Sequence, residues 1–352
     1  MSTKEKVLNE LYRNKGIETS GEQLAKICGV SRTAIWKAVN TLRQEGHSIT
    51  GTTKGGYLLS ENANVFSDSL VKEYISSNFP ELSECRLECF KEIDSTNTYA
   101  KRLLAENGNL RDSLGNLTDA GKKFHKSVVI AESQTAGRGR LGRSFISPLN
   151  TGIYITLIYA PEGGVQNPAR MTACSAVGVC RAIENVYGVK TSIKWINDIF
   201  SENGKKVCGI LTEGFTNFES GLIESAIIGI GINICENPSE FPEEVAKVAG
   251  AILSENSGNS KRHELAGEVA GQVLKVLEED PAEIIKEYRE KSFLIGHTVQ
   301  VYPVIGDESK AYKAKVIDVD NNAALVVELE NKEQRTLISG EVTLKSENII
   351  NS

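Results

Sequence analysis

The first 64 residues differ in charge from the rest of the chain, and this contrast constrains the fold most. They carry nine Lys or Arg and six Asp or Glu, a net charge of +3, whereas the remaining residues carry 31 and 40, a net charge of −9. A chain of 352 residues has room for two or three domains. A basic N-terminal segment on an acidic body therefore predicts a separate nucleic-acid-binding module at residues 1–64.

Residues 1–64 have the pattern of three short helices followed by a two-stranded hairpin. Ser20 is placed to cap a second helix that buries Leu24 and Ile27 and stops at Gly29, and Ser31 is placed to cap a third. The glycine-rich stretch HSITGTTKGGYLL after the third helix predicts a β-hairpin wing. The sequence therefore predicts a winged helix-turn-helix, followed by a polar linker at 60–69.

The third helix has the composition of a recognition helix. Its apolar stripe points inward, and its other side carries hydrogen-bonding and cationic groups that can reach base edges and phosphates. The alternative is a small helical domain with an ordinary solvated face, which accounts less well for the helix spacing and the basic wing. The predicted DNA-binding residues are Ser31, Arg32, Thr33, Trp36, Lys37, Asn40 and, near the tip of the wing, Lys54.

The cysteines and the apolar runs bear on the location of the protein. Seven scattered cysteines without CxxC pairs suit reduced thiols, and they disfavour a disulfide scaffold or a cysteine-held zinc site. No apolar run approaches the roughly 18 to 20 residues of a membrane-spanning helix, and the start of the chain lacks the apolar core of a signal peptide. We therefore expect a cytoplasmic protein with no membrane partner.

The most informative segments of the acidic body follow predicted strands. The turn Asp94-Ser95-Thr96-Asn97 precedes a helix, where hydroxyls and backbone N–H groups can hold a polar or anionic ligand, although such a turn can also be an ordinary helix cap. After the strand 128–132, residues 133–143 combine three glycines with three arginines, which predicts a loop able to wrap an anion. An RNA-contacting loop is the alternative, but it fits poorly within an acidic domain.

Two lysines lie on a predicted hairpin. A strand at 191–195 leads to a turn at 202–205 and a partner strand at 206–213. A two-residue turn puts Lys206 on the face of Asn197 and Lys194 on the face of Asp198, so without a bulge they do not point at one ligand. The following apolar strand 225–234 contains two glycines, which allow a ligand or another chain segment to approach closely.

The C-terminal part predicts two helices and then only strands. Helices are expected at 261–279 and 281–291, the second capped by Asp280. Five short strands follow Gly296 and predict a small β-barrel.

The order of these motifs resembles one known family. DSTN, QTAGRGRLGR, KWIND, KxxGILTE and GIGINI in this order resemble the catalytic domain of biotin protein ligases, and residues 1–64 resemble the DNA-binding domain of the bifunctional biotin ligase/biotin operon repressors. The resemblance covers nearly the whole chain. It implies an α+β fold: a winged helix-turn-helix at 1–64, a mixed α/β ligase domain of the biotin/lipoate transferase type at 65–294, and an SH3-like barrel at 295–352. A lipoate-attaching enzyme is expected to lack the GRGRLGR loop.

The resemblance also implies an activity. Biotin attacks the α-phosphate of Mg-ATP to give biotinyl-5′-AMP, and a lysine of the biotin carboxyl carrier protein of acetyl-CoA carboxylase then takes the biotinyl group. ATP, Mg²⁺ and biotin are the implied ligands. The adenylate is the intermediate and also the corepressor, which favours a homodimer that binds operator DNA and represses biotin genes. The barrel either helps to place ATP and the carrier or is a structural cap.

The residues carried over by this resemblance fall into three groups, and none is assigned to a metal ion. Contacts to biotin are implied at Ser95, Thr96, Asn97, Gln134, Arg138, Gly139, Arg140, Lys206 and Gly209. Catalytic roles are implied for Lys206, Arg138, Arg140 and Arg143, and ATP binding for Lys194, Asn197, Asp198 and Asn233.

Three departures from the family pattern leave an alternative function open. Ile196 stands where such ligases usually have Pro, and Phe145 stands where a tryptophan is common, although phenylalanine can still stack on a ligand. The polar insert 107–125 predicts a mobile surface excursion near the entrance to the site. Ile196 and the insert keep open a non-catalytic biotin-sensing repressor, which Lys206 and the intact arginine loop disfavour.

Overall fold

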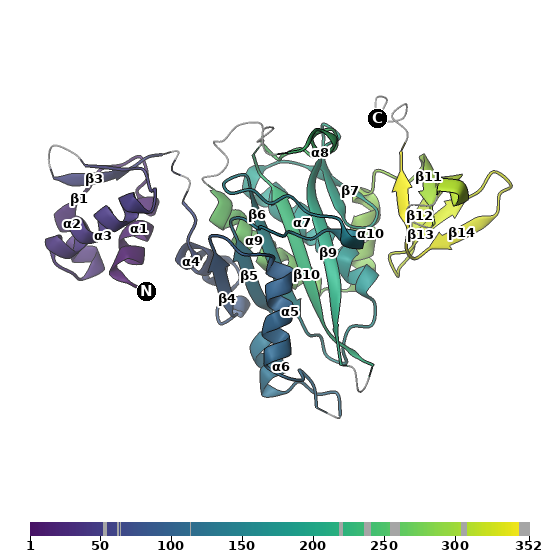
Figure 1. Ribbon diagram of the computed structural model, residues 1–352, viewed down its shortest axis with the longest axis horizontal. Helices are drawn as coiled ribbons and strands as arrows, with labels where there is room; N and C mark the ends of the chain where they lie inside the picture. Colours follow the sequence, from purple (N-terminus) through teal and green to yellow (C-terminus); the bar gives the residue numbers. More distant parts are fainter. Residues whose placement is uncertain are drawn as a thin grey trace.

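Three structural parts follow one another along the long axis of the molecule (Figure 1). The computed structural model describes residues 1–51, 55–61, 63, 65–112, 114–217, 221–235, 241–253, 261–303 and 308–344. Within these residues the sheets have three, seven and five strands. Helices of 18 or more residues apolar enough to cross a membrane are absent from the described residues.

The N-terminal part, called the head below, is a three-helix bundle with a small sheet. Ser2, Ser20 and Ser31 each cap a helix by accepting a hydrogen bond from the backbone N–H three residues later, as the sequence predicts for the last two. The elements are α1 (Thr3–Arg13), β1 (Thr19–Ser20), α2 (Gly21–Cys28), α3 (Arg32–Gln44), β2 (Ile49–Gly51) and β3 (Gly56–Leu59). Strands β2 and β3 form the antiparallel wing, and β1 pairs with the other edge of β3.

Two predictions for the head are wrong in detail. Ile27 is 51% exposed, because α2 turns Leu24 and Cys28, which are four residues apart, toward the core. The segment after the wing is also not a free linker, since Ala63 and Val65 are buried in the core of the head.

A seven-stranded sheet in the order β4-β5-β6-β10-β9-β8-β7 forms the central domain. Only β4 and β5 pair in parallel among the described strands of this sheet. The strands are β4 (Leu87–Phe90), β5 (Ser127–Ala131), β6 (Gly152–Tyr159), β7 (Thr191–Lys194), β8 (Asp198–Ser201), β9 (Lys206–Thr216) and β10 (Ile223–Asn233).

Helices cover both faces of this sheet. The main hydrophobic core lies between one face and the helices α4 (Asp68–Asn78), α7 (Pro168–Tyr187), α9 (Arg262–Val276) and α10 (Pro281–Lys291). A smaller core lies on the other face, where α5 (Thr96–Glu106) and α6 (Asp119–Phe124) pack on β6 and β10. Because α5 begins directly after Ser95, the predicted ligand-binding turn lies over this second face.

The C-terminal part is an antiparallel sheet whose buried side chains join the main core. Trp195 Nε1 donates a 2.8 Å hydrogen bond to the carbonyl of Ala323, which ties the end of β7 to this sheet. The sheet has the order β14-β13-β12-β11-β15, and its strands are β11 (Thr298–Tyr302), β12 (Tyr312–Val319), β13 (Leu325–Glu328), β14 (Gln334–Leu337) and β15 (Glu341–Thr343).

The first turn of α9 contacts both the head and the central sheet. Arg262 is fully buried; its guanidinium binds the Glu132 carboxylate at 2.9 Å and the Gly152 carbonyl at 3.1 Å. The next residue, His263, packs edge-on against the ring of Tyr12 in α1, with ring centroids 4.5 Å apart. Burial lowers the pKa of His263 to about 4, so this contact is made by a neutral ring near pH 7.

The insert 107–125 does not lie where the sequence predicts. Leu110, Arg111 and Phe124 are buried, and Arg111 donates to the backbone carbonyls of Pro161 and Glu224. These carbonyls lie where β6 ends and β10 begins, at the lower end of the sheet in Figure 1, near α6. The expected surface excursion is therefore an anchored segment, away from the part of β10 that lines the pocket described next.

Candidate active site

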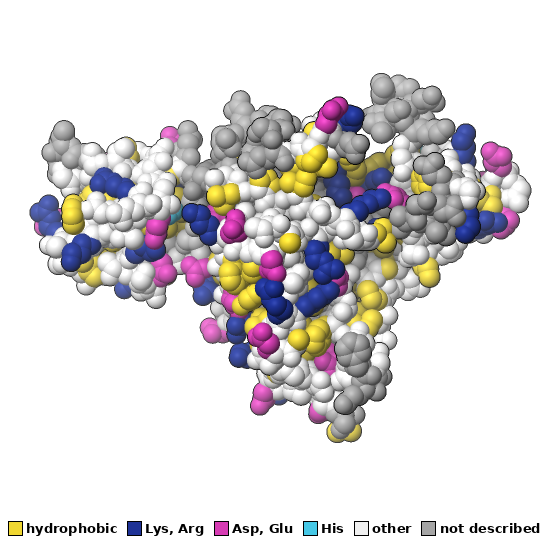
Figure 2. All heavy atoms as spheres, in the orientation of Figure 1, with side chains coloured by type: hydrophobic (Ala, Val, Ile, Leu, Met, Phe, Trp, Pro, Cys, Tyr) yellow, Lys and Arg dark blue, Asp and Glu magenta, His cyan; other side chains and the backbone are white. Residues whose placement is uncertain are grey.

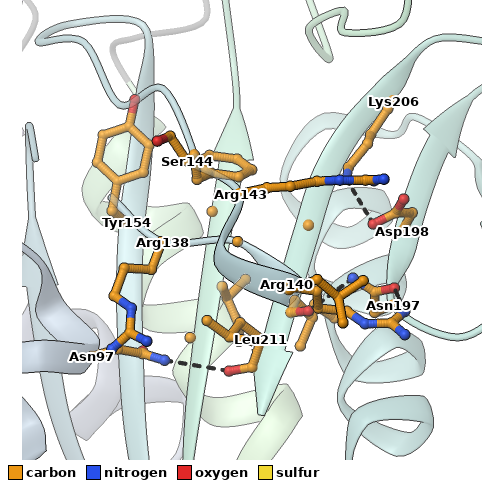
Figure 3. A pocket seen from close by; sticks show the side chains of 18 of the residues that line it. Asn97, Arg138, Arg140, Arg143, Ser144, Tyr154, Asn197, Asp198, Lys206 and Leu211 are labelled. Carbon is orange, nitrogen blue, oxygen red and sulfur yellow. Dashed lines mark hydrogen bonds and ion pairs between the residues drawn. The ribbon is translucent and has the colours of Figure 1, made fainter. Parts of the chain in front are cut away.

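A pocket lies on the α5 face of the central sheet, beneath the loop that joins β5 to β6 (Figure 3). Most residues singled out in the sequence line it, although they come from four separate segments. They are Ser95, Thr96, Asn97, Gln134, Arg138, Gly139, Arg140, Arg143, Lys194, Asn197, Asp198, Lys206 and Gly209.

Two glycines of β10 make room for the side chains that form the pocket. A Cβ atom at Gly229 would lie 2.3 Å from Asn97 Oδ1, and one at Gly231 would lie 2.5 Å from the ring of Phe145. Distances below 3.0 Å are essentially never found, so each position needs glycine unless its neighbour moves. The prediction that a ligand or another chain segment approaches β10 closely at its glycines is confirmed: the side chains of Asn97 and Phe145 do so.

The predicted biotin-binding turn is held by a buried hydrogen-bond network. Ser95 caps α5, and both the backbone N–H and the hydroxyl of Thr96 bond to Gln134 Oε1, at 2.9 and 3.2 Å. The Thr156 hydroxyl donates to Asn97 Oδ1 at 2.6 Å. Because the turn and Thr156 are buried and Gln134 is half-buried, these hydrogen bonds fix the polar floor of the pocket.

Each arginine of the loop 137–143, called the arginine loop below, has a polar partner on a different element. Arg138 faces a glutamate of β9, Arg140 an asparagine just before β8, and Arg143 a glutamate of the C-terminal sheet, which it binds with both Nη atoms. The pairs are Arg138–Glu213 at 3.5 Å, Arg140–Asn197 at 2.6 Å and Arg143–Glu341 at 3.0 and 2.9 Å.

A β-bulge brings both lysines to the same pocket. The pairing of β8 with β9 shifts after Ile199, so that Phe200 faces Lys206. This shift turns Lys206 to the face of Asp198, where Lys194 also lies, and Lys206 Nζ is 2.7 Å from Asp198 Oδ1. The register predicted from the turn holds for Asp198–Gly209 and Ile199–Cys208. The bulge that this prediction left open then intervenes before Lys206, so the two lysines meet in one pocket and do not diverge.

The acid–base properties of the pocket follow from burial and pairing. Burial lowers the pKa of Lys194, an effect that the negative charge of Asp198 opposes. Burial acts to raise the pKa of Glu213, but hydrogen bonds from Lys101 and Asn97 outweigh it, so this pKa lies below its ordinary value. A pair of lysines therefore lines one end of the pocket, and a charged glutamate outside the lining accepts a hydrogen bond from Asn97 at the other end.

Some site residues differ from the sequence analysis. Asn233 does not line the pocket, since it is buried and its Nδ2 donates to the carbonyl of Gly250 at 3.1 Å. Glu341, Trp195 and Tyr154 do line it, although the sequence analysis missed them. Trp195 lies within the KWIND motif, so its position next to predicted site residues could have indicated it. No local sequence pattern indicates that Glu341 belongs to the pocket.

The predicted DNA-binding side of α3 faces solvent. Ser31, Arg32, Thr33, Trp36 and Lys37 are exposed, and Asn40 is half-buried, whereas Lys54 lies outside the described residues. Figure 2 shows several Lys and Arg side chains on the visible face of the head.

Comparison with known proteins gives the family. A sequence profile of the biotin/lipoate A/B protein ligase family matches residues 113–233, and a profile of an HTH domain matches residues 3–58. The chain is 35% identical over 252 residues to the bifunctional ligase/repressor BirA of Bacillus subtilis, and the match covers 71% of each chain. The chain belongs to the bifunctional biotin ligase/repressor family.

Two further relatives agree with this family. The bifunctional ligase/repressor BirA of Escherichia coli is 27% identical over 331 residues, and the match covers 93% of each chain. The biotin protein ligase of Aquifex aeolicus in complex with biotin and ATP shares the fold, with a TM-score of 0.54, 23% identity, and coverage of 74% of this chain and 98% of that one. This chain is thus a biotin protein ligase and a repressor, and the catalytic function is favoured over the non-catalytic alternative.

Proposed function

We propose that this ligase forms biotinyl-5′-AMP from biotin and ATP in the pocket beneath the arginine loop. Pyrophosphate leaves in this step. The biotinyl group then passes to a lysine of the biotin carboxyl carrier protein of acetyl-CoA carboxylase, with release of AMP. One observation supports the proposal most: three arginines and two lysines from separate segments line the same pocket as the buried turn 95–97. Such a density of positive charge suits a reaction that joins a carboxylate to a phosphate.

The polar floor is the proposed biotin site. Ser95, Thr96, Asn97 and Gln134 offer hydroxyl and amide groups on rigid elements, which suits a small polar ring system. Gly139 and Gly209 add surface without side chains, so the ligand can approach the backbone.

The cations are the proposed catalytic groups. Lys206 neutralises the biotin carboxylate and the α-phosphate as the two anions approach, and Arg138, Arg140 and Arg143 form the electrostatic clamp of the loop. Closure of the loop over the adenylate excludes water from a mixed anhydride that water would otherwise hydrolyse.

ATP is proposed to bind at the other end of the pocket, near Lys194, Asn197 and Asp198. The described residues contain no cluster of three His, Cys, Asp or Glu that could hold a metal ion by themselves. A magnesium ion that arrives with ATP and keeps several waters needs only one or two protein carboxylates. Asp198 can supply one of them. The role of Asn233 in ATP binding stays a prediction.

The regulatory part of the proposal concerns the whole chain. The adenylate acts as corepressor and favours a homodimer, and two heads then bind a two-fold operator through α3 and the wing. We propose domains at 1–64, 65–294 and 295–352, the last an SH3-like barrel, and a cytoplasmic location, in keeping with seven free cysteines.

Incubation of the full chain with ATP, biotin and a carboxyl carrier domain tests the enzymatic part. Mass spectrometry should show the carrier heavier by one biotinyl group, and a carrier whose acceptor lysine is replaced by arginine is the matched control. An unmodified wild-type carrier, with ATP consumed or not, would overturn the proposed transfer.

A further inference from the structure

Lys206 is the first residue of β9 and lies at a bulge, so the regular pairing of the sheet does not fix its direction. A separate segment supports it instead. The Lys206 N–H donates to the carbonyl of Val248 and the Gly250 N–H donates to the carbonyl of Lys206, both at 2.9 Å. Residues 248–250 therefore bind both backbone polar groups of the lysine.

Gly250 allows this segment to lie against the strand. A Cβ atom at Gly250 would lie 2.4 Å from the Cβ of Lys205 and 3.1 Å from its Cγ. The Lys205 side chain cannot swing away freely, because its Nζ donates to the carbonyls of Ala246 at 3.3 Å and Lys247 at 2.6 Å. A methyl group at position 250 must therefore push the segment away from β9.

Gly250 is also held on its other side. Its carbonyl accepts the 3.1 Å hydrogen bond from Asn233 at the end of β10, and the Ile252 N–H donates to the Asn233 carbonyl at 3.1 Å. The segment 248–250 is thus fixed to β10 at one edge and to Lys206 at the other, so its position sets the position of the lysine backbone.

We propose that Gly250 is a positioning residue for Lys206: because it lacks a side chain, residues 248–250 can pair with the lysine backbone and aim Nζ at the pocket beside Asp198. Gly250 does not line the pocket and touches no reacting atom. This inference rests on the role proposed for Lys206. Since misplacing a catalytic group by about 1 Å can cost about a hundredfold in rate, a small displacement of this segment has a large effect.

Pyrophosphate release from saturating ATP and biotin tests the proposal in the full chain. Gly250→Ala should lower kcat at least about tenfold, with little change in KM or in the thermal midpoint. In the double variant Gly250→Ala/Lys205→Gly, the Cβ and Cγ atoms that clash are gone, so kcat should recover toward that of Lys205→Gly alone. Lys205→Ala keeps the clashing Cβ and is the matched control: it should not rescue Gly250→Ala.

Each outcome separates the positioning proposal from the role of Lys206. Normal kcat in Gly250→Ala, or equal rescue by Lys205→Ala and Lys205→Gly, overturns the positioning role. Unchanged pyrophosphate release by Lys206→Ala overturns the proposed role of the lysine itself. A loss of kcat in Gly250→Ala that follows a large fall in thermal midpoint, without recovery in the double variant, shows a structural defect and also counts against positioning.

Discussion

The predicted recognition helix α3 and the arginine loop both present cations, but they hold them differently. Within the described residues, Arg32 and Lys37 of α3 are exposed and make no ion pair. The arginines of the loop each face an asparagine or glutamate from another element. An anion can therefore bind to α3 directly, whereas an anion in the pocket competes with partners that already orient the arginines. Affinity for DNA should depend strongly on salt, and catalysis should depend on geometry.

The largest effect is expected at the pocket end that holds the lysines. Lys206→Ala should lower adenylate formation by about a hundredfold or more, because its charge is used where charge develops in the transition state. Pyrophosphate release from ATP and biotin measures it, and an unchanged thermal midpoint serves as the control for folding. Without biotin and ATP, DNA binding by the head should not change in this variant, and a loss of DNA binding under these conditions would contradict the separation of the two cationic regions.

A smaller effect is expected within the arginine loop. Arg140→Gly removes a guanidinium held 2.6 Å from Asn197, so biotinyl-5′-AMP should dissociate about tenfold faster. Arg140→Lys keeps the charge but loses the planar fork, and it should recover only part of the retention. Stopped-flow measurement of adenylate release gives the rates. Equal release from the wild type and both variants would contradict the clamp.

The affinity of the head for DNA should depend on how many phosphate groups its cations contact. Replacing both Arg32 and Lys37 by Ala should weaken binding to a DNA duplex a few-fold and reduce the slope of log affinity against log salt by about two. Fluorescence anisotropy across a salt series measures this slope, and adenylate formation is the control. If the slope stays at the wild-type value, these two residues do not contact phosphates.

The smallest effect concerns the link from the loop to the C-terminal sheet. The hydrogen bond from Arg143 holds the pKa of Glu341 below its ordinary value of 4.5. The pair therefore stabilises the fold above pH 4.5, and this contribution disappears as the pH falls through the lowered pKa. Because both side chains are partly exposed, Glu341→Gln should cost well under about 1 kcal/mol near pH 7. Thermal midpoints of wild type and variant should converge on acidification; divergence would contradict the pair.

Features set by neighbours in sequence were predictable. The serine caps of α2 and α3 involve residues three positions apart, and the four residues Ile35, Ala38, Val39 and Leu42 are buried as their helical spacing predicts. The order of the motifs also predicted correctly that most of the pocket residues belong to one site. In α2 the helical spacing did not decide which residue is buried, because Ile27 and Cys28 both fit an apolar stripe.

Features set by distant residues were not predictable. The bulge at Lys206 lies beside the segment 248–250, more than forty positions along the chain. The insert is anchored because Arg111 donates to the carbonyls of Pro161, just after β6, and of Glu224, at the start of β10, both of which follow it in the chain. Glu341 reaches the pocket only because the C-terminal sheet packs there. Each case depends on a contact that no local pattern encodes.

Arg262 has a consequence for communication across the molecule. It holds Glu132 and Gly152, the residues between which the arginine loop runs, and the adjoining His263 and Glu264 hold Tyr12 of the head. The first turn of α9 thus contacts both residues that flank the arginine loop and the first helix of the head. A displacement of that turn would therefore move contacts of both the head and the segment that carries the arginine loop.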